Sequence, residues 1–135
     1  MPDKSETFRK NERLCNKKAI AELFENGISF YSFPFQIIWI KSPDELTPPA
    51  RVAISVSKKY FRRAVRRNLI RRRIREAYRR NKYILYEFLG SRNVSIIFII
   101  IFKDKTIPEY TVIEKTIRDS IGKLIADITN KEPVC

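Results

Sequence analysis

The chain has 135 residues, of which 44% are hydrophobic and 12% aromatic, and it carries a net charge of +13 at pH 7. This length suits one domain, and the apolar content is that of a globular protein rather than of a disordered basic tail. The longest apolar run, residues 94–102, is about half as long as a membrane-crossing helix requires, so no membrane span is predicted.

The first predicted elements are a basic and polar arm over residues 1–15 and a short helix that follows it. Asn16 can cap this helix, because its side chain can accept hydrogen bonds from the backbone N–H groups of the first turn. The helix places Ile20 and Phe24 on one face, and Gly27 is expected to end it.

Two strands joined by a proline-rich loop are predicted next. In the first strand, residues 33–40, alternation predicts a core face of Phe33, Phe35, Ile37 and Trp39. The opposite face of that strand carries Gln36, Ile38 and Ile40. In the second strand, residues 51–57, one face consists of the small side chains of Ala53, Ser55 and Ser57. Such a face leaves room for a ligand or for another element.

A long helix follows from about residue 62 to residue 85 or 89, then an apolar strand over 94–102 and a last helix that starts between 108 and 111. The strand is apolar on both faces, so we expect other elements to cover both. The predicted order is therefore α-β-β-α-β-α, an α+β single domain over residues 16–129 in which helices pack on one sheet. Residues 130–135 are expected to form a flexible tail.

The long helix carries most of the excess charge: 13 of the 28 Lys and Arg residues, but one of the 15 acidic residues, lie between Lys58 and Lys82. At 100° per residue, its core-facing stripe contains Ile70, Ile74, Ala77 and Tyr78. Neighbouring like charges destabilise a helix, whereas guanidinium forks suit phosphate. We therefore predict a nucleic-acid-binding surface formed by Lys58, Lys59, Arg62, Arg63, Arg66, Arg67, Asn68, Arg71, Arg72, Arg75 and Arg79.

Three motifs of this region closely resemble the protein subunit of bacterial ribonuclease P: SVSKK (55–59), RRAVRRN (62–68) and RRRIRE (71–76). The signature of that family, Arg-Asn-x-x-Lys/Arg-Arg-x-x-Arg-Glu, matches at Arg67, Asn68, Arg71, Arg72, Arg75 and Glu76. The stretch ELFENG (22–27) fits the family's first helix and its glycine stop, and the order of elements agrees over about residues 8–128.

The resemblance implies an α/β sandwich with a left-handed βαβ crossover, similar to domain 2 of ribosomal protein S5. It also implies that the chain is the accessory subunit of ribonuclease P, the endoribonuclease that removes the 5′ leader of precursor tRNA. The implied partners are precursor tRNA and the catalytic RNA subunit, which carries the catalytic centre and its Mg²⁺. No obligatory protein partner is expected, and the cytoplasm is the expected location.

The residues independently predict that the chain has no active site of its own. The sequence contains no histidine, and none of the three predicted strands contains a carboxylate, whereas two-metal nucleases need several acidic groups around the metals. Ser55 and Ser57 therefore have no histidine base. Cys15 and Cys135 lack the spacing of a disulfide or zinc framework. We expect neither a catalytic residue nor a metal site in the protein.

A shallow groove for single-stranded RNA is predicted if the small-residue face of the second strand and the Gln36 face of the first coincide. Its residues would be Ile20, Phe24, Gln36, Ile38 and Ser55, with the first helix as a wall. The residues alone leave open the alternative that this is ordinary core under a loose helix. The resemblance favours the groove, because Phe24, Ser55, Asn68 and Arg71 match family positions that hold the leader, although Ile20 stands where the family often has an aromatic residue.

Three further alternatives stay open on the residues alone. Asn68, a poor helix former, either caps or bridges locally or else holds a neighbouring arginine or a ribose hydroxyl. A ribosomal or ribosome-assembly protein would present the same basic helix without any processing role. An intrinsic nuclease is the enzyme alternative, against which the missing histidines and strand carboxylates count.

Overall fold

The computed structural model describes residue 8 and residues 10–131. It contains a short 3-10 helix, three α-helices and four strands: η1 (Lys10–Glu12), α1 (Lys17–Asn26), β1 (Ile28–Ser32), β2 (Phe35–Lys41), β3 (Ala50–Val56), α2 (Ala64–Arg92), β4 (Ile96–Phe102) and α3 (Tyr110–Lys131). Residues 130 and 131 of the predicted tail are the last two of α3, and the rest of that tail lies outside the described residues. No helix in the described part is long and apolar enough to cross a membrane.

The four strands form one mixed sheet in the order β1-β2-β4-β3. β1 pairs antiparallel with β2, β2 pairs antiparallel with β4, and β3 runs parallel to β4. The unit β3-α2-β4 is therefore a parallel crossover through the longest helix; its left-handed sense stays a prediction. The expected class, an α+β single domain, is confirmed.

The predicted order α-β-β-α-β-α was wrong in one respect, because β1 precedes β2 and forms a hairpin with it. We expected Phe33 to face the core, yet its side chain is 77% exposed in the turn between the two strands. Phe35, Ile37 and Trp39 are buried as predicted. The alternating pattern was extended one step too far, across the turn.

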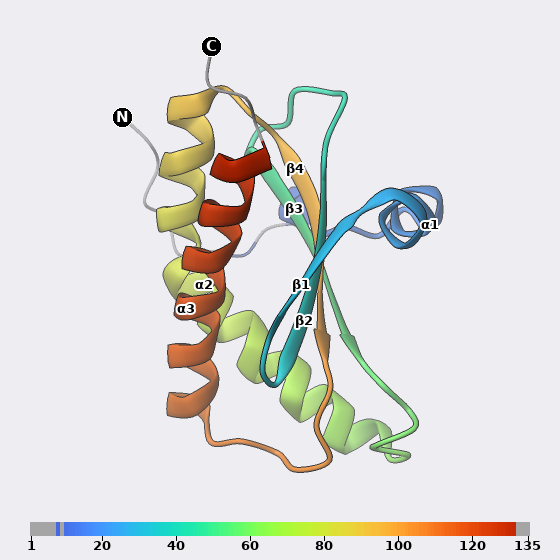
Figure 1. Ribbon diagram of the computed structural model, residues 1–135. Helices are drawn as coiled ribbons and strands as arrows, with labels where there is room; N and C mark the ends of the chain where they lie inside the picture. Colours follow the sequence, from blue (N-terminus) through green and yellow to red (C-terminus); the bar gives the residue numbers. More distant parts are fainter. Residues whose placement is uncertain (1–7, 9, 132–135) are drawn as a thin grey trace.

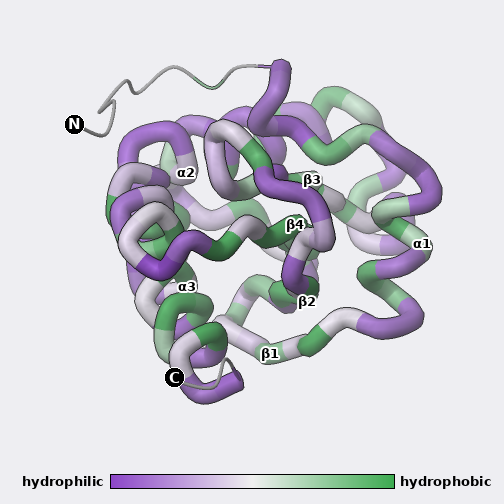
Figure 2. The backbone as a smooth tube through the Cα atoms, turned by 90° about the horizontal axis from the view of Figure 1, so that it is seen from above, coloured by the Kyte–Doolittle hydropathy of each residue, from purple (hydrophilic) through white to green (hydrophobic). Residues whose placement is uncertain are grey.

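Helices cover both faces of the sheet (Figure 1): α2 and α3 lie side by side on one face, and α1 lies on the other. The main core lies between the sheet and the α2–α3 pair, where Ile70, Ile74, Ala77 and Tyr78 of α2 are all 0% exposed, as predicted. Trp39 reaches α3, where its Nε1 donates a hydrogen bond to Oδ2 of Asp127 over 2.6 Å. Figure 2 shows the hydrophobic strand β4 in the middle of the molecule, between these layers.

The second face of the sheet is only partly covered. Leu23 of α1 is fully buried in a smaller cluster with Leu14, Ile38 and Ile99. Ile97 and Ile101 of β4 point to the same face but are only half-buried. The prediction that both faces of β4 are fully covered was therefore wrong, because the ten residues of α1 are too few to shield the whole face.

The ends of α1 are set by two residues in the predicted way. Oδ1 of Asn16 accepts hydrogen bonds from the backbone N–H groups of Lys18 and Ala19, and Gly27 donates its own N–H to the carbonyl of Leu23. A Cβ on Gly27 would collide with the Leu23 carbonyl oxygen and lie 2.5 Å from Cγ2 of Ile38. Gly27 therefore ends the helix because the chain passes close to β2 there.

The described residues before α1 pack against the domain. The N–H of Leu14 donates to the carbonyl of Val52 over 2.9 Å, so this segment runs along the free edge of β3. Glu12 is 2% exposed, and its Oε1 accepts hydrogen bonds from Nζ of Lys82 at 2.5 Å and from the hydroxyl of Tyr86 at 2.7 Å. This buried ion pair joins η1 to α2, and Lys82 does not contribute its charge to the outer face of the helix.

Candidate nucleic-acid interface

The basic residues predicted on α2 and on the loop before it form one outward-facing set. We call this set the arginine surface, and its members are Lys58, Lys59, Arg62, Arg63, Arg66, Arg67, Asn68, Arg71, Arg72, Arg75 and Arg79. All but Arg67, Arg71 and Arg79 are exposed, and these three are half-buried. The burial of the opposite stripe of α2 in the main core makes this side face solvent.

Contacts within the protein position three members of the arginine surface. Nη1 of Arg67 donates to the carbonyl oxygens of Phe61 and Arg62, each at 2.8 Å, and so holds the loop that leads into α2. Nη1 of Arg71 donates to Oδ1 of Asn68 over 3.1 Å. This hydrogen bond fits both alternatives for Asn68, a local bridge and the positioning of a neighbouring arginine.

Glu76 is the acidic residue within this basic stretch. Nε and Nη2 of Arg79 donate to its two carboxylate oxygens, each at 2.8 Å, and Nε of Arg80 lies 3.3 Å from Oε2. The hydrogen bonds from Arg79 lower the pKa of the Glu76 carboxyl, so it is ionised at neutral pH. Arg72 and Arg75, by contrast, make no ion pair with any described acidic residue, and their guanidinium groups are exposed.

The sheet face beside α1 contains the second predicted site. We expected β2 and β3 to be neighbours, but β4 lies between them. Their predicted faces nevertheless coincide, because Gln36, Ile101 and Ser55 form one row across the three strands, and Ile38, Ile99 and Ala53 form the next. The alternate isoleucines of β4 are floor residues that the sequence interpretation missed.

The predicted groove residues divide into covered and open positions. Ile38 is 6% exposed and packs in the small cluster, with Ile20 half-buried beside it. Phe24 is 58% exposed at the next turn of α1. Gln36 and Ser55 are half-buried, and Nε2 of Gln36 donates to Oγ of Ser29 over 2.9 Å. The open part of this face therefore offers an aromatic ring, an amide and a hydroxyl.

Tyr31 is a residue of this face that the sequence interpretation did not find. It pairs with Gln36 in the sheet register, so it extends the row of Ser55 onto β1, and it is 66% exposed. Nζ of Lys103 lies 5.6 Å from the centre of its ring. The alternation of residues 28–32 could have revealed this position if the hairpin had been recognised.

The groove face and the arginine surface are continuous along the chain. β3 ends at Val56, Lys58 and Lys59 follow in the loop, and α2 begins at Ala64. The N–H of Lys59 donates to Oγ of Ser57 over 3.1 Å, which holds the start of this loop. The loop that contains Lys58 and Lys59 therefore joins the two surfaces along the chain.

The described residues contain no group of three His, Cys, Asp or Glu side chains that could hold a metal ion. The buried hydroxyls of Tyr78 and Tyr86 both have a raised pKa, chiefly because burial disfavours the charged form. Both hydroxyls stay protonated and serve the contact with Glu12. Cys15 is a free, exposed thiol. The described groups of these surfaces can bind a ligand by charge, hydrogen bonds and stacking.

Comparison with known proteins identifies relatives of the whole domain. A family model described as Ribonuclease P matches residues 8–125. The ribonuclease P protein component of Porphyromonas gingivalis is 29% identical over 119 residues, which cover 88% of this chain and 87% of the relative. The same component from Chlorobaculum tepidum is 33% identical over 120 residues, covering 82% and 78% of the two chains.

Solved structures show the same fold. The RNase P protein of Thermotoga maritima superposes with a TM-score of 0.65 at 22% identity, covering 83% of this chain and 96% of that one. The RNase P protein of Staphylococcus aureus superposes with a TM-score of 0.62 at 23% identity, covering 84% and 94% of the two chains.

Proposed function

Because the chain belongs to the bacterial ribonuclease P protein family, we propose that it binds the RNA subunit through the arginine surface and the precursor-tRNA leader through the groove. As a family member it is a component of ribonuclease P, the tRNA-processing endoribonuclease, and it associates with the RNase P RNA. The observation that carries the proposal is the exposure of Arg72 and Arg75, which make no ion pair with a described acidic residue, on a helix whose other side is core.

The arginine surface suits a folded RNA because it presents forked donors at fixed positions. At about 1.5 Å per residue, Arg66 and Arg79 are roughly 20 Å apart along α2, enough to meet several phosphates. Guanidinium groups donate to phosphate in a bidentate manner and stay charged at any physiological pH. The helix is anchored over its whole core stripe, so these groups keep their spacing when RNA binds.

The groove suits a single strand because its groups match what unpaired nucleotides offer. Bases stack on exposed aromatic rings, and Phe24 supplies one such ring. Gln36 and Ser55 can hydrogen-bond to base edges or ribose hydroxyls. Lys58 and Lys59 lie where the strand would leave the groove toward the arginine surface.

The role of this chain in cleavage is to bind and orient RNA. The described residues do not fit a protein-held metal site, since no acidic cluster is present among them. As the family resemblance implies, we assign the catalytic centre and its Mg²⁺ to the RNA subunit. Such a role places the chain in the cytoplasm with its RNA partners. No described contact favours the ribosome-assembly alternative, and the family match favours ribonuclease P.

Reconstitution tests the proposal directly. The protein, the RNase P RNA and a precursor tRNA are combined at low Mg²⁺, and correct 5′ ends are measured. We expect cleavage with both subunits and none with the protein alone. Replacing Arg72 and Arg75 together with glutamine should weaken the stimulation, whereas the matched pair Lys115→Gln and Lys123→Gln on α3 should not. Cleavage that follows the protein after complete removal of RNA would contradict the assignment.

A further inference from the structure

A second group of basic side chains lies apart from the arginine surface, at the free edge of the sheet. Lys10, Asn11, Arg13 and Arg51 line one surface hollow there. Lys10 and Asn11 belong to η1, Arg13 follows it, and Arg51 belongs to β3. None of these four residues is in the predicted arginine surface or groove.

The backbone fixes this group in place. Arg13 pairs with Val52 through a parallel bridge on the free edge of β3, and Arg51 is the neighbour of Val52. Glu12, the acidic residue of the same turn, is buried and bonded to Lys82. The negative charge of the segment therefore points into the protein, and three positive charges remain around the hollow.

The basic side chains of the hollow make no ion pair within the described part of the chain. Nε of Arg51 is buried there without a hydrogen-bond partner, whereas Arg73 donates to the carbonyl of Pro108. The hydrogen bond to Pro108 gives Arg73 a structural role, and Nε of Arg51 has no such contact.

Arg13 connects this hollow with the arginine surface. Its guanidinium carbon lies 5.3 Å from the centre of the Phe8 ring, and that ring packs edge-on against Tyr78 of α2. On its other side, Phe8 lines a second hollow with Arg72, Arg75, Glu76 and Arg79. Stacking on a ring uses the face of a guanidinium and leaves its in-plane N–H donors available.

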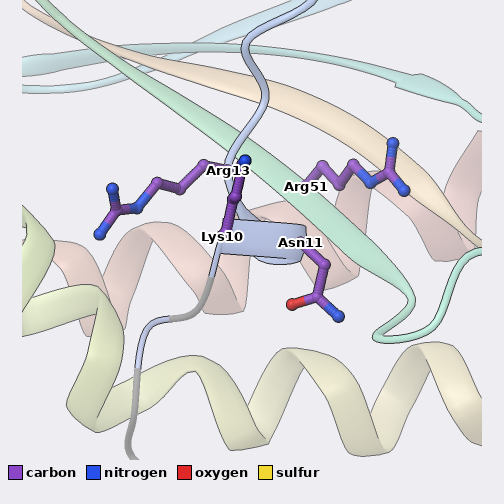
Figure 3. Close-up of a pocket in the computed structure, with 4 residues that line it drawn as sticks. All are labelled: Lys10, Asn11, Arg13 and Arg51. Carbon is purple, nitrogen blue, oxygen red and sulfur yellow. The ribbon is translucent and has the colours of Figure 1, made fainter.

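The directions of the side chains indicate which anion they suit. Figure 3 shows Arg13 and Arg51 extending to opposite sides of Lys10. Diverging donors cannot surround one small anion, but they can meet successive phosphates of a chain. A nucleic-acid backbone carries such a row of charges and is the polyanion that the neighbouring surface binds in the proposed function.

We propose that Lys10, Arg13 and Arg51 form a second phosphodiester-binding surface for RNA, which Phe8 joins to the arginine surface. This inference rests on the proposed function and adds a contact region on the β3 edge. The bound backbone is that of the RNase P RNA, because Phe8 joins this surface to the arginine surface, which binds the RNA subunit in the proposed function.

The test is the salt dependence of RNA affinity for a Lys10→Gln, Arg13→Gln double variant. Both side chains are exposed, so the fold should tolerate the change, which a thermal melt checks. The control is the double variant Lys115→Gln, Lys123→Gln, which removes the same charge from exposed positions of α3. A single variant, Arg51→Gln, tests the half-buried member separately.

Affinity is measured for the RNase P RNA and, with the assembled enzyme, for precursor tRNA. We expect the slope of log affinity against log salt to fall by about one to two for the Lys10, Arg13 variant, with no change for the control. A reduced slope with the RNase P RNA supports the proposal, and a reduced slope only with precursor tRNA overturns it in favour of the substrate. Slopes equal to the control for both RNAs overturn this inference alone. A wild-type protein without salt-dependent binding to either RNA overturns the proposed function as well.

Discussion

Oδ1 of Asn68 accepts a hydrogen bond from Nη1 of Arg71, 3.1 Å away and one turn further along α2. An amide in this position limits the rotamers of the arginine. Asn68 is a poorer helix former than alanine, so its presence lowers helix propensity at an exposed site. We therefore propose that Asn68 is a positioning residue for Arg71.

The variant Asn68→Ala separates this role from stability. We expect its free energy of unfolding to be unchanged or raised by up to about 0.5 kcal/mol, because alanine is the better helix former. Its affinity for the RNase P RNA should fall roughly two- to tenfold, because ordering a free arginine on binding costs about 0.5–1.5 kcal/mol. Urea unfolding and RNA titration measure the two quantities. A less stable variant with unchanged affinity would contradict the positioning role.

The variant Phe24→Ala tests the groove. Since Phe24 is 58% exposed, the loss of stability should be well below the roughly 3–5 kcal/mol of a buried phenylalanine. Binding of the assembled enzyme to precursor tRNA should weaken by about 1–3 kcal/mol, the value of one stacked base. Mature tRNA, which has no leader, should bind as before.

The matched control for Phe24 is Tyr83→Ala, which removes a 43% exposed aromatic ring from α2, on the other face of the sheet. It should leave the ratio of affinities for precursor and mature tRNA unchanged. If Phe24→Ala weakens the binding of precursor tRNA and of mature tRNA equally, the groove does not bind the leader.

The ion pair of Glu76 predicts a pH dependence. Arg79 lowers the pKa of this carboxyl in the folded protein below its ordinary value of 4.5. The stabilisation is therefore present above the unfolded pKa and is lost as the pH falls through the folded pKa. Glu76→Gln should lower the free energy of unfolding at pH 7 by less than about 1 kcal/mol, because the pair is partly exposed.

The difference between Glu76→Gln and wild type should shrink as urea unfolding is repeated from pH 7 down to pH 3. The same variant should bind RNA more tightly at low salt, because it removes the negative charge beside Arg79 and Arg80. A stability difference that grows toward acid pH would be inconsistent with the ion pair.

Two glycines should respond in opposite ways to alanine. Gly27→Ala should lower stability by about 1–3 kcal/mol, because its Cβ would collide with the Leu23 carbonyl and crowd Ile38. Gly122→Ala should raise stability by about 0.5–1 kcal/mol, because it lies inside α3 with nothing within 4 Å of the new Cβ. Thermal melts of both variants measure these changes. Equal shifts of the melting temperature would show that the close contacts of Gly27 do not exclude a larger side chain there.

The sequence predicts best where one periodicity covers a long element. The stripe of α2 from Ile70 to Tyr78 follows a helical repeat over several turns, and all its members are buried. The hairpin was harder, because β1 has five residues and its turn contains a phenylalanine that continues the apparent alternation. A short element contains too few repeats of the alternating pattern to distinguish a strand from a turn.

Sequence patterns could not predict the contacts between segments that are distant in the chain. Nothing local indicates that β4 lies between β2 and β3, so the isoleucine floor of the groove was missed. Glu12 and Lys82 are 70 residues apart and meet only because η1 packs against α2. From the sequence alone, Lys82 looks like part of the basic face of the helix, but it is buried in the structure.

The burial of one side of α2 and the charge on its other side restrict how this helix can evolve. One residue inserted directly after Arg75 would rotate the part of α2 beyond it by about 100° relative to the part before it. Either the core stripe or the arginine row would then point the wrong way. The loop between β2 and β3, residues 42–49, has no such coupling to a helical repeat. Relatives should therefore differ in α2 by substitution, and in length at loops of this kind.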